Sequence, residues 1–263
     1  MSHQSLLWSL RSAAGKSSWL FGTMHIKDNR AYQLCNQLYP LILQSDGYIG
    51  EMDLSRNTMS YDLLPYDINQ YLKTEAFLKL EHQLKKSFGI NLNQWAHVHP
   101  LMIMSVISNS VLQSEHHISL DEHLWKFAEE HGKKTSGLES HDEQLTILHS
   151  IDPKPIYKQL LNISRNPGSI RKNTDRSLKL YMSGRIHELY LLSKSSMQHL
   201  RKKVIYERNR KMAAVIDQLD QDSQYFITVG AAHLSGKYGL ITMLKKKGYL
   251  LKAVKLISIL KAN

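Results

Sequence analysis

Short apolar runs near both ends of the chain alternate with longer stretches in which apolar residues have helical spacing. The runs are rich in aliphatic and aromatic residues and are bounded by turn-forming or acidic residues, which is typical of strands. We predict strands at residues 6–10, 18–22, 47–53, 225–229 and 249–259. The first two flank Ala14-Gly15-Lys16, where glycine supplies the positive φ that a hairpin turn needs.

Much of the remaining chain has the three-to-four-residue spacing of amphipathic helices. Predicted helices cover residues 31–44, 71–88, 102–112, 121–131, 198–219 and 235–247. A short strand is expected at 133–138, ending at Glu139, before a helix that starts with the capping box Ser140-His141-Asp142-Glu143. We therefore predict one mixed α/β domain over residues 1–263, with a central β-sheet formed by the N- and C-terminal segments. The largely helical middle, about residues 61–220, is expected to act as a cap or insertion.

The composition is that of an ordinary globular protein, with 42% hydrophobic and 22% charged residues among 263. The single cysteine, Cys35, excludes an internal disulfide and a cysteine-rich zinc module, and its place on a predicted amphipathic helix favours burial. No window reaches the roughly 18 apolar residues of a membrane span, and the first residues lack the pattern of a secretory leader. We expect a soluble cytoplasmic protein, or an exported one if a leader has been removed.

The net charge of +11 favours anionic partners on electrostatic grounds. Much of the excess lies at residues 201–211 and 245–247, which have the pattern of solvated helix faces. Because no nucleic-acid-binding module or row of aromatic residues accompanies this charge, nucleic acid is not the expected partner. The sequence does not specify an oligomeric state.

Two predicted strands end in the same motif, Gly-x-x-His. The first gives Gly22-Thr23-Met24-His25 and the second Gly230-Ala231-Ala232-His233, while Glu51 and then Asp53 end a third strand. Glycine permits the bend and lets a ligand approach the backbone. Since ligands bind outside the carboxyl ends of strands in open α/β sheets, these side chains predict either a metal site or an acid–base site without metal.

Other histidine groupings carry less weight. A third Gly-x-x-His, Gly184-Arg185-Ile186-His187, lies in a helical stretch and is interpreted as accidental. His97-Val98-His99 and His116-His117 flank a helix boundary and are interpreted as satisfied or exposed loop histidines. The motif His-Glu-x-x-His, the Gly-x-Ser-x-Gly elbow, the phosphate loop and the dinucleotide fingerprint are all missing, which excludes most standard hydrolases and nucleotide enzymes.

Taken in order, several pieces of the chain resemble the TraB/GumN family, which also includes PrgY and the animal Tiki proteins. The pieces are Leu7-Trp8, Leu20-Phe21-Gly22-Thr23-Met24-His25, Glu51-Met52-Asp53, Ser119-Leu120-Asp121, Gly137-Leu138-Glu139-Ser140, Glu143-Gln144-Leu145, Glu207-Arg208-Asn209 and Val229-Gly230-Ala231-Ala232-His233-Leu234. The resemblance implies a fold similar to the erythromycin-esterase and ChaN-like proteins. It also implies an active centre built on the two Gly-x-x-His motifs and a glutamate.

The resemblance further implies a metal-dependent peptidase of bacterial type. Tiki members are described as peptidases supported by manganese or cobalt, and the enterococcal members counter a peptide pheromone. By position, His25 and His233 match the motif histidines, Glu51 matches the glutamate, and Arg208 and Asn209 match an arginine–asparagine pair. Many bacterial relatives carry an export signal, which this sequence does not show.

The resulting hypothesis is a hydrolase in which His25, His233 and Glu51 bind one divalent ion, with manganese or cobalt favoured over zinc. Glu139 is the candidate general base or hydrogen-bond partner of a ligand, and Arg208 the candidate for the substrate carboxylate or oxyanion. Asn209, Gly22 and Gly230 are candidate substrate contacts, and the substrate is a peptide or another small acyl compound. Two alternatives remain: a metal-free, esterase-like hydrolase with a histidine base, and a non-catalytic protein that binds a peptide or haem.

Overall fold

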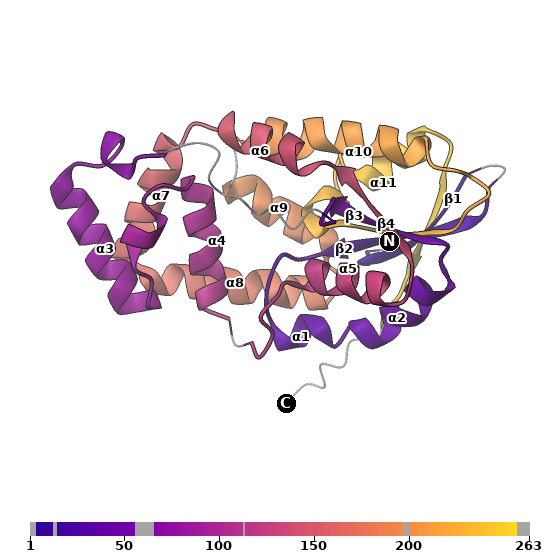
Figure 1. The fold of residues 1–263 in the computed structure, drawn as a ribbon, viewed down its shortest axis with the longest axis horizontal. Coiled ribbons are helices and arrows are strands. Elements are labelled where there is room, and N and C mark those ends of the chain that lie inside the picture. The colour runs from indigo at the N-terminus through magenta and orange to yellow at the C-terminus, as the bar shows by residue number, and fades with distance from the viewer. Residues whose placement is uncertain (1–3, 13–14, 56–65, 113, 197–199, 257–263) are drawn as a thin grey trace.

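A six-stranded mixed sheet forms the centre of the molecule, with strand order β4-β3-β5-β2-β1-β6 (Figure 1). A computed structural model describes residues 4–12, 15–55, 66–112, 114–196 and 200–256. The strands are β1 Leu7–Arg11, β2 Ser17–Thr23, β3 Gly47–Met52, β4 Lys134–Glu139, β5 Tyr225–Gly230 and β6 Leu250–Val254. Helices lie around this sheet, so the predicted mixed α/β class is confirmed.

Four neighbouring strands, β4, β3, β5 and β2, run parallel. Their carboxyl ends therefore lie along one edge, where Thr23 pairs with Gly230 and Met52 pairs with Glu139. The strands β1 and β6 run antiparallel to this set. The pairing of β1 with β2 confirms the predicted hairpin; Ala14 of its turn lies outside the described residues. This common edge is where the sequence predicts the site.

Side chains along each strand follow its place in the sheet. The central strand β5 is buried from Phe226 to Val229 because helices cover both faces, which explains why this run is apolar apart from Thr228. At one end of the strand order, β4 alternates, with Lys134 and Ser136 exposed. Polar residues of this kind are common on edge strands. The short strand predicted at 133–138 is confirmed as β4, although this run is only weakly apolar.

Helices cover both faces of the sheet (Figure 1). One side carries α1 Asn29–Tyr32, α2 Cys35–Gln44 and α5 Leu120–Glu130, and the other carries α10 Arg208–Asp217 and α11 Leu240–Lys246. The predicted helix at 31–44 is thus two helices, separated by tight turns in which the amides of Gln33 and Leu34 donate three residues back. Cys35 is buried, as predicted, and burial raises the pKa of its thiol to about 11.

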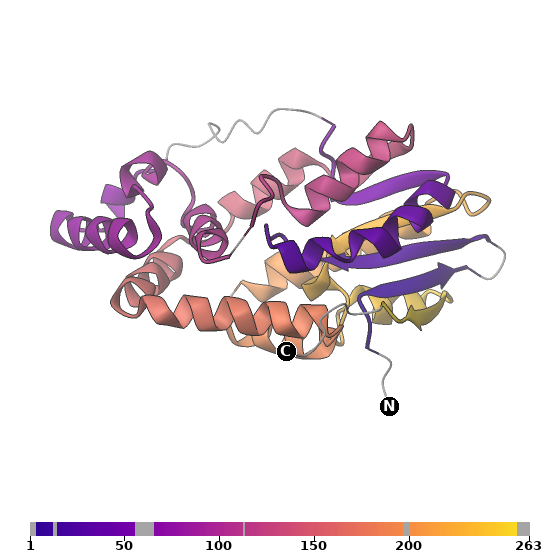
Figure 2. The same cartoon turned by 90° about the horizontal axis from the view of Figure 1, so that it is seen from below.

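A helical lobe lies beside the sheet and has its own apolar core (Figures 1 and 2). It consists of η2 Ile68–Gln70, α3 Thr74–Phe88, η3 Leu92–Trp95, α4 Pro100–Ser110 and α7 Lys154–Arg165. The helix α8 Pro167–Met182 leads from this lobe back to the sheet, while α6 His141–His149 and α9 Ile186–Ser196 complete the connections. The predicted range of the insertion, about residues 61–220, stays a prediction. Within this range β4 belongs to the sheet, and residues 61–65 lie outside the described part.

The predicted long helix at 198–219 contains a π-helical segment, Lys202–Glu207, which continues into α10; residues 198–199 lie outside the described part. A π segment adds a residue per turn and rotates the next turns of the helix relative to a regular one. Arg208 and Asn209, which directly succeed it in the chain, are both buried. In the described residues every helix is too short or too polar to cross a bilayer, and a cytoplasmic location stays a prediction.

His99 is a satisfied histidine in the helical lobe. It caps α4: its Nδ1 accepts from the amide of Leu101 at 3.3 Å, and its Nε2 therefore donates to the carbonyl of Ile151, also at 3.3 Å. The ring is buried at 2% exposure, and burial lowers its pKa below 6.5. The neutral ring is thus the form that the folded protein accommodates.

Acidification below pH 6.5 is expected to destabilise the lobe through His99. Its pKa is lower in the folded than in the unfolded chain, so this contribution is complete above pH 6.5 and is lost as the pH falls below it, at no more than about 1.4 kcal/mol per pH unit. Urea unfolding at pH 7.5 and 5.5 measures the loss. His99→Asn keeps a capping oxygen without titrating. Its free energy of unfolding should therefore change less between the two pH values than that of the wild type; an equal change in both proteins would contradict the prediction.

Candidate functional site

Glu51 lies at the shared carboxyl edge of the parallel strands. Its Oε2 accepts from the backbone amide of Gly230 at 2.6 Å, and its Oε1 accepts a short hydrogen bond from Nη2 of Arg208. The same Oε1 lies 3.7 Å from Nε2 of His233. The sequence-predicted glutamate and one of the two motif histidines are therefore adjacent, although they are 182 positions apart in the sequence.

Arg208 joins two carboxylates. Its Nε donates to both oxygens of Glu139, at 3.1 and 2.9 Å, and its Nη2 donates to Glu139 Oε2 at 2.5 Å as well as to Glu51. Glu139 is 2% exposed and also accepts from Gln144 at 3.3 Å. The predicted capping box is confirmed: Ser140 and Glu143 start α6 directly after Glu139 and fix the end of β4.

This network sets the protonation of Glu51 and His233. Burial by itself raises the pKa of Glu51, but His233, Arg208 and the Gly230 amide together outweigh it and lower that pKa to about 2. Burial lowers the pKa of His233 to about 4 despite the attraction of Glu51. At neutral pH the site thus holds an ionised carboxylate beside a neutral imidazole.

Asn209 fixes the orientation of His233. The Nδ2 group of Asn209 donates to the carbonyls of His233 and Tyr238, at 3.0 and 2.6 Å, so its Oδ1 is the acceptor for His233 Nδ1 at 2.5 Å. Nδ1 therefore carries the proton, and Nε2 keeps its lone pair on the side of Glu51. Asn209 is fully buried, so a role in holding His233 is supported, and its predicted contact with substrate stays a prediction that this arrangement does not favour.

His25 lies in the loop after β2, and 73% of its side chain is exposed. Its Nδ1 contacts Oδ2 of Asp121 on α5 at 2.6 Å. Asp121 raises the pKa of His25 to about 9, and Glu51 acts in the same direction, so the field of Glu51 reaches the ring.

The three predicted metal ligands are not all within coordinating reach of one another. In the part of the chain that the structure describes, no three histidine, cysteine, aspartate or glutamate side chains are grouped closely enough to hold a metal ion. Glu51 and His233 are adjacent, and His25 lies at the end of a strand that shares their edge. The three-ligand set stays a prediction.

Both motif glycines have tight surroundings. A Cβ at Gly22 would lie 2.6 Å from Leu234, so glycine here lets η5 Ala231–His233 pack against β2. A Cβ at Gly230 would lie 3.3 Å from Oε2 of Glu51, at the point where the carboxylate approaches the backbone. These contacts explain both glycines by packing, and substrate contact at either stays a prediction. Asp53 is engaged locally, where its Oδ1 accepts from the amide and hydroxyl of Ser55.

The side chains at this edge have the chemistry of a cation site. Neutral imidazole nitrogen and carboxylate oxygen are ordinary ligands of divalent metals, and 3.7 Å between Nε2 of His233 and Oε1 of Glu51 is a spacing that two bonds of about 2 Å can bridge. Two carboxylates, those of Glu51 and Glu139, share one guanidinium, that of Arg208. The one excess negative charge favours a cation, and Glu51 and His233 fit two of the ligands of a divalent ion.

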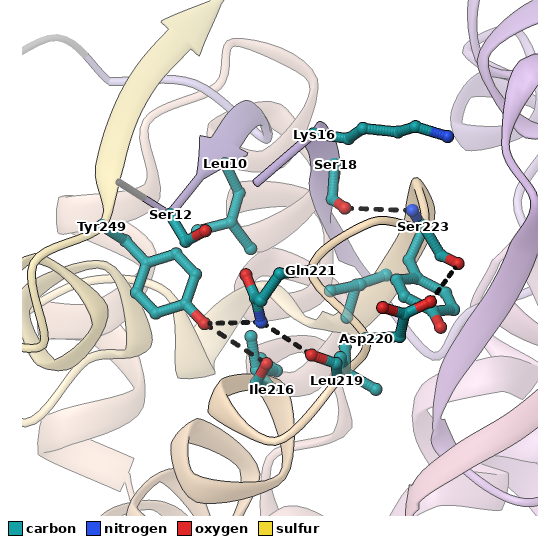
Figure 3. Close-up of a pocket in the computed structure, with 12 residues that line it drawn as sticks. Leu10, Ser12, Lys16, Ser18, Ile216, Leu219, Asp220, Gln221, Ser223 and Tyr249 are labelled. Carbon is teal, nitrogen blue, oxygen red and sulfur yellow. Dashed lines mark hydrogen bonds between the residues drawn. The ribbon is translucent and has the colours of Figure 1, made fainter. Parts of the chain in front are cut away.

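A small cavity lies at the opposite ends of β2 and β5 (Figure 3). Ser18, Gln221 and Tyr249 are among its lining residues, and Gln221 Nε2 donates to the Leu219 carbonyl at 2.7 Å. Its volume of about 20 Å³ holds roughly one water molecule. None of the predicted site residues lines it, so it is not part of the candidate site.

Sequence reasoning missed Asp121 as a site residue. The tripeptide Ser119-Leu120-Asp121 belongs to the pieces that resemble the family, but its position before a helix suggested only a helix start. The contact between His25 and Asp121 joins residues 96 positions apart, and local patterns carry no information about such a pairing.

Comparisons with known proteins show that the chain is similar to animal proteins named metalloproteases. The chain is 24% identical to a Metalloprotease TIKI homolog of Amphimedon queenslandica, with 93% of this chain and 60% of that protein covered. It is 21% identical to Metalloprotease TIKI1 of Danio rerio, covering 93% and 62%, and 22% identical to Metalloprotease TIKI1 of Homo sapiens, covering 93% and 61%. The chain thus spans about three fifths of the length of these relatives.

No solved structure was found to match the chain. The model of the TraB/PrgY/gumN family matches residues 6–253, nearly the whole sequence, as the ordered motifs predicted. The chain therefore belongs to the TraB/PrgY/gumN family.

Proposed function

We propose that this protein is a metal-dependent hydrolase that cleaves peptides. The observation that carries the proposal is the pairing of Glu51 with His233, whose Nε2 is left unprotonated by the contact between Nδ1 and Asn209. The similarity to proteins named metalloproteases supports the reaction class. In this proposal His25, His233 and Glu51 hold one divalent ion, with manganese or cobalt favoured over zinc by the family resemblance.

When bound, such an ion would lower the pKa of a water ligand and polarise the scissile carbonyl. The residues of the chain prepare the site for this chemistry. Asn209 holds His233 in the tautomer that presents Nε2, and Arg208 holds the Glu51 carboxylate in its ionised form. Outer partners of this kind fix ligand orientation in metal sites.

Arg208 also supports a substrate contact. Two of its nitrogens, Nε and Nη2, bind Glu139 and Glu51. The third, Nη1, has no hydrogen-bond partner among the described residues, and 11% of the Arg208 side chain is exposed. We assign Nη1 to the substrate carboxylate or the oxyanion, because a guanidinium held rigidly by two acids is preorganised for that task. Glu139, which is buried against Arg208, holds this guanidinium and is less suited to act as a general base.

Cleavage of a peptide library, read by mass spectrometry with Mn²⁺, Co²⁺ or Zn²⁺ added, tests the proposal. We expect metal-dependent cleavage that Glu51→Gln and His25→Ala each lower by more than about 100-fold, the upper range for loss of an outer partner of a metal ligand. His187→Ala is the matched control, because His187 ends a third Gly-x-x-His but lies exposed on α9 near Ser235. This control should keep full activity.

Two other outcomes would replace the proposal. Cleavage that persists after removal of metal by a chelator would identify a metal-free hydrolase, in which neutral His233 is the candidate base. Retention of an intact peptide or of haem over hours, unaffected by Glu51→Gln, would identify a binding protein.

A further inference from the structure

The two motif histidines are anchored in the same way by different elements. His233 Nδ1 contacts the side-chain oxygen of Asn209 at 2.5 Å, and His25 Nδ1 contacts the side-chain oxygen of Asp121 at 2.6 Å. Because a carboxylate accepts, Nδ1 of His25 is the donor. Nε2 is the other ring nitrogen in both histidines; it is unprotonated in His233 and can bind a ligand in His25 once it has lost its proton.

His25 has little else to hold its ring. It follows β2 in an irregular segment, and 73% of its side chain is exposed. The neighbouring backbone is fixed to the start of α5, where the amide of Leu120 donates to the carbonyl of Ile26 at 3.3 Å. The loop and the acid are therefore held in register by the backbone, and the contact with Asp121 is the side-chain hydrogen bond that orients the imidazole.

Asp121 is placed for this task rather than only for its helix. An acid in the first turn of a helix interacts favourably with the helix dipole, and Glu122 beside it already supplies one. That role does not require the 2.6 Å contact with His25 or the hydroxyl of Ser119, which donates to the same Oδ2 at 3.3 Å. The second oxygen, Oδ1, is buried without a hydrogen-bond partner in the described part of the chain, a cost that a purely structural acid would avoid on the surface.

We propose that Asp121 is a positioning residue for His25, holding Nδ1 so that Nε2 is presented as a ligand, as Asn209 does for His233. The role in ligand presentation rests on the proposed metal-dependent function, whereas the orientation of the ring by Asp121 does not. Loss of an outer partner of this kind typically weakens metal binding by about 10- to 100-fold.

Two measurements test the proposal. Carbon-13 relaxation of the His25 ring in metal-free protein, with the signal assigned from His25→Ala, should show an ordered ring in the wild type and in Asp121→Asn, which keeps an acceptor oxygen. In Asp121→Ala the ring should become mobile. Titration calorimetry with Zn²⁺ should show about 10- to 100-fold weaker binding for Asp121→Ala and a change of only a few-fold for Asp121→Asn.

Ser119→Ala is the matched control, since it removes the other neighbour of Oδ2 without touching His25. It should leave both measurements near those of the wild type. A His25 ring as ordered in Asp121→Ala as in the wild type, or unchanged Zn²⁺ affinity, would overturn the proposal. If Asp121→Ala does not fold, Asp121→Leu, which has a similar shape but no acceptor oxygen, gives the same decision. A wild type that binds no metal would refute the proposed function, and the ring measurement would still decide whether Asp121 orients His25.

Discussion

Replacing Arg208 with methionine should lower the free energy of unfolding by about 3–5 kcal/mol, the usual cost of removing one partner from a buried ion pair. The guanidinium lies between Glu51 and Glu139, and Glu139 is almost completely buried. Without it the two carboxylates face each other with no cation between them. Urea unfolding of metal-free protein at pH 7.5 measures the change.

Arg210→Met is the control for this experiment, because Arg210 lies on the same helix two residues further on and is exposed. Its effect should stay within about 0.5 kcal/mol. Adding Glu139→Gln to Arg208→Met removes one of the two unpaired charges and should restore part of the stability. If Arg208→Met unfolds at the same urea concentration as Arg210→Met, the network contributes nothing to folding.

Replacing Asn209 with alanine should cost roughly 3 kcal/mol, since it leaves several buried groups without partners. These are Nδ1 of His233 and the carbonyl oxygens of His233 and Tyr238. The same change frees the imidazole to rotate, so metal affinity should fall with stability. Thermal and urea unfolding, with calorimetry for the metal, measure both effects.

A comparison with Asn209→Asp separates the two functions of the side chain. Aspartate still accepts from His233 Nδ1 but cannot donate to the two carbonyls. It should therefore retain more metal affinity than alanine while remaining destabilised. Equal metal affinity in the alanine variant and the wild type would show that Asn209 does not orient His233.

Much of the sheet could be predicted from the sequence because its signals are local. The apolar runs at Tyr48-Ile49 and Phe226-Ile227 belong to strands buried on both faces, and the capping box at Ser140 marks the end of β4. The family motifs then indicated that Glu51 and His233 meet. The pairing of distant strands brings those two residues together. Their meeting could be expected because ligands bind at the carboxyl ends of the strands in open α/β sheets.

The rest of the site depends on contacts that no local pattern encodes. The helix containing Arg208 was predicted, but not the π segment before it or the two carboxylates that the guanidinium joins. The burial of Asn209 and the anchoring of His25 by Asp121 likewise arise from packing between elements far apart in the sequence. No group of three potential metal ligands is present among the described residues, so the part of His25 in metal binding stays a prediction.

The position of β5 constrains how this protein is made on the ribosome. This strand lies between β2 and β3 in the sheet, although it is encoded only at residues 225–230. During translation β2 and β3 emerge long before β5. The edges of β2 and β3 that pair with β5 therefore stay without this partner while some 170 further residues are synthesised. Nascent chains of this kind expose strand edges and invite chaperone binding, and a chain stopped before Tyr225 cannot complete the middle of its sheet.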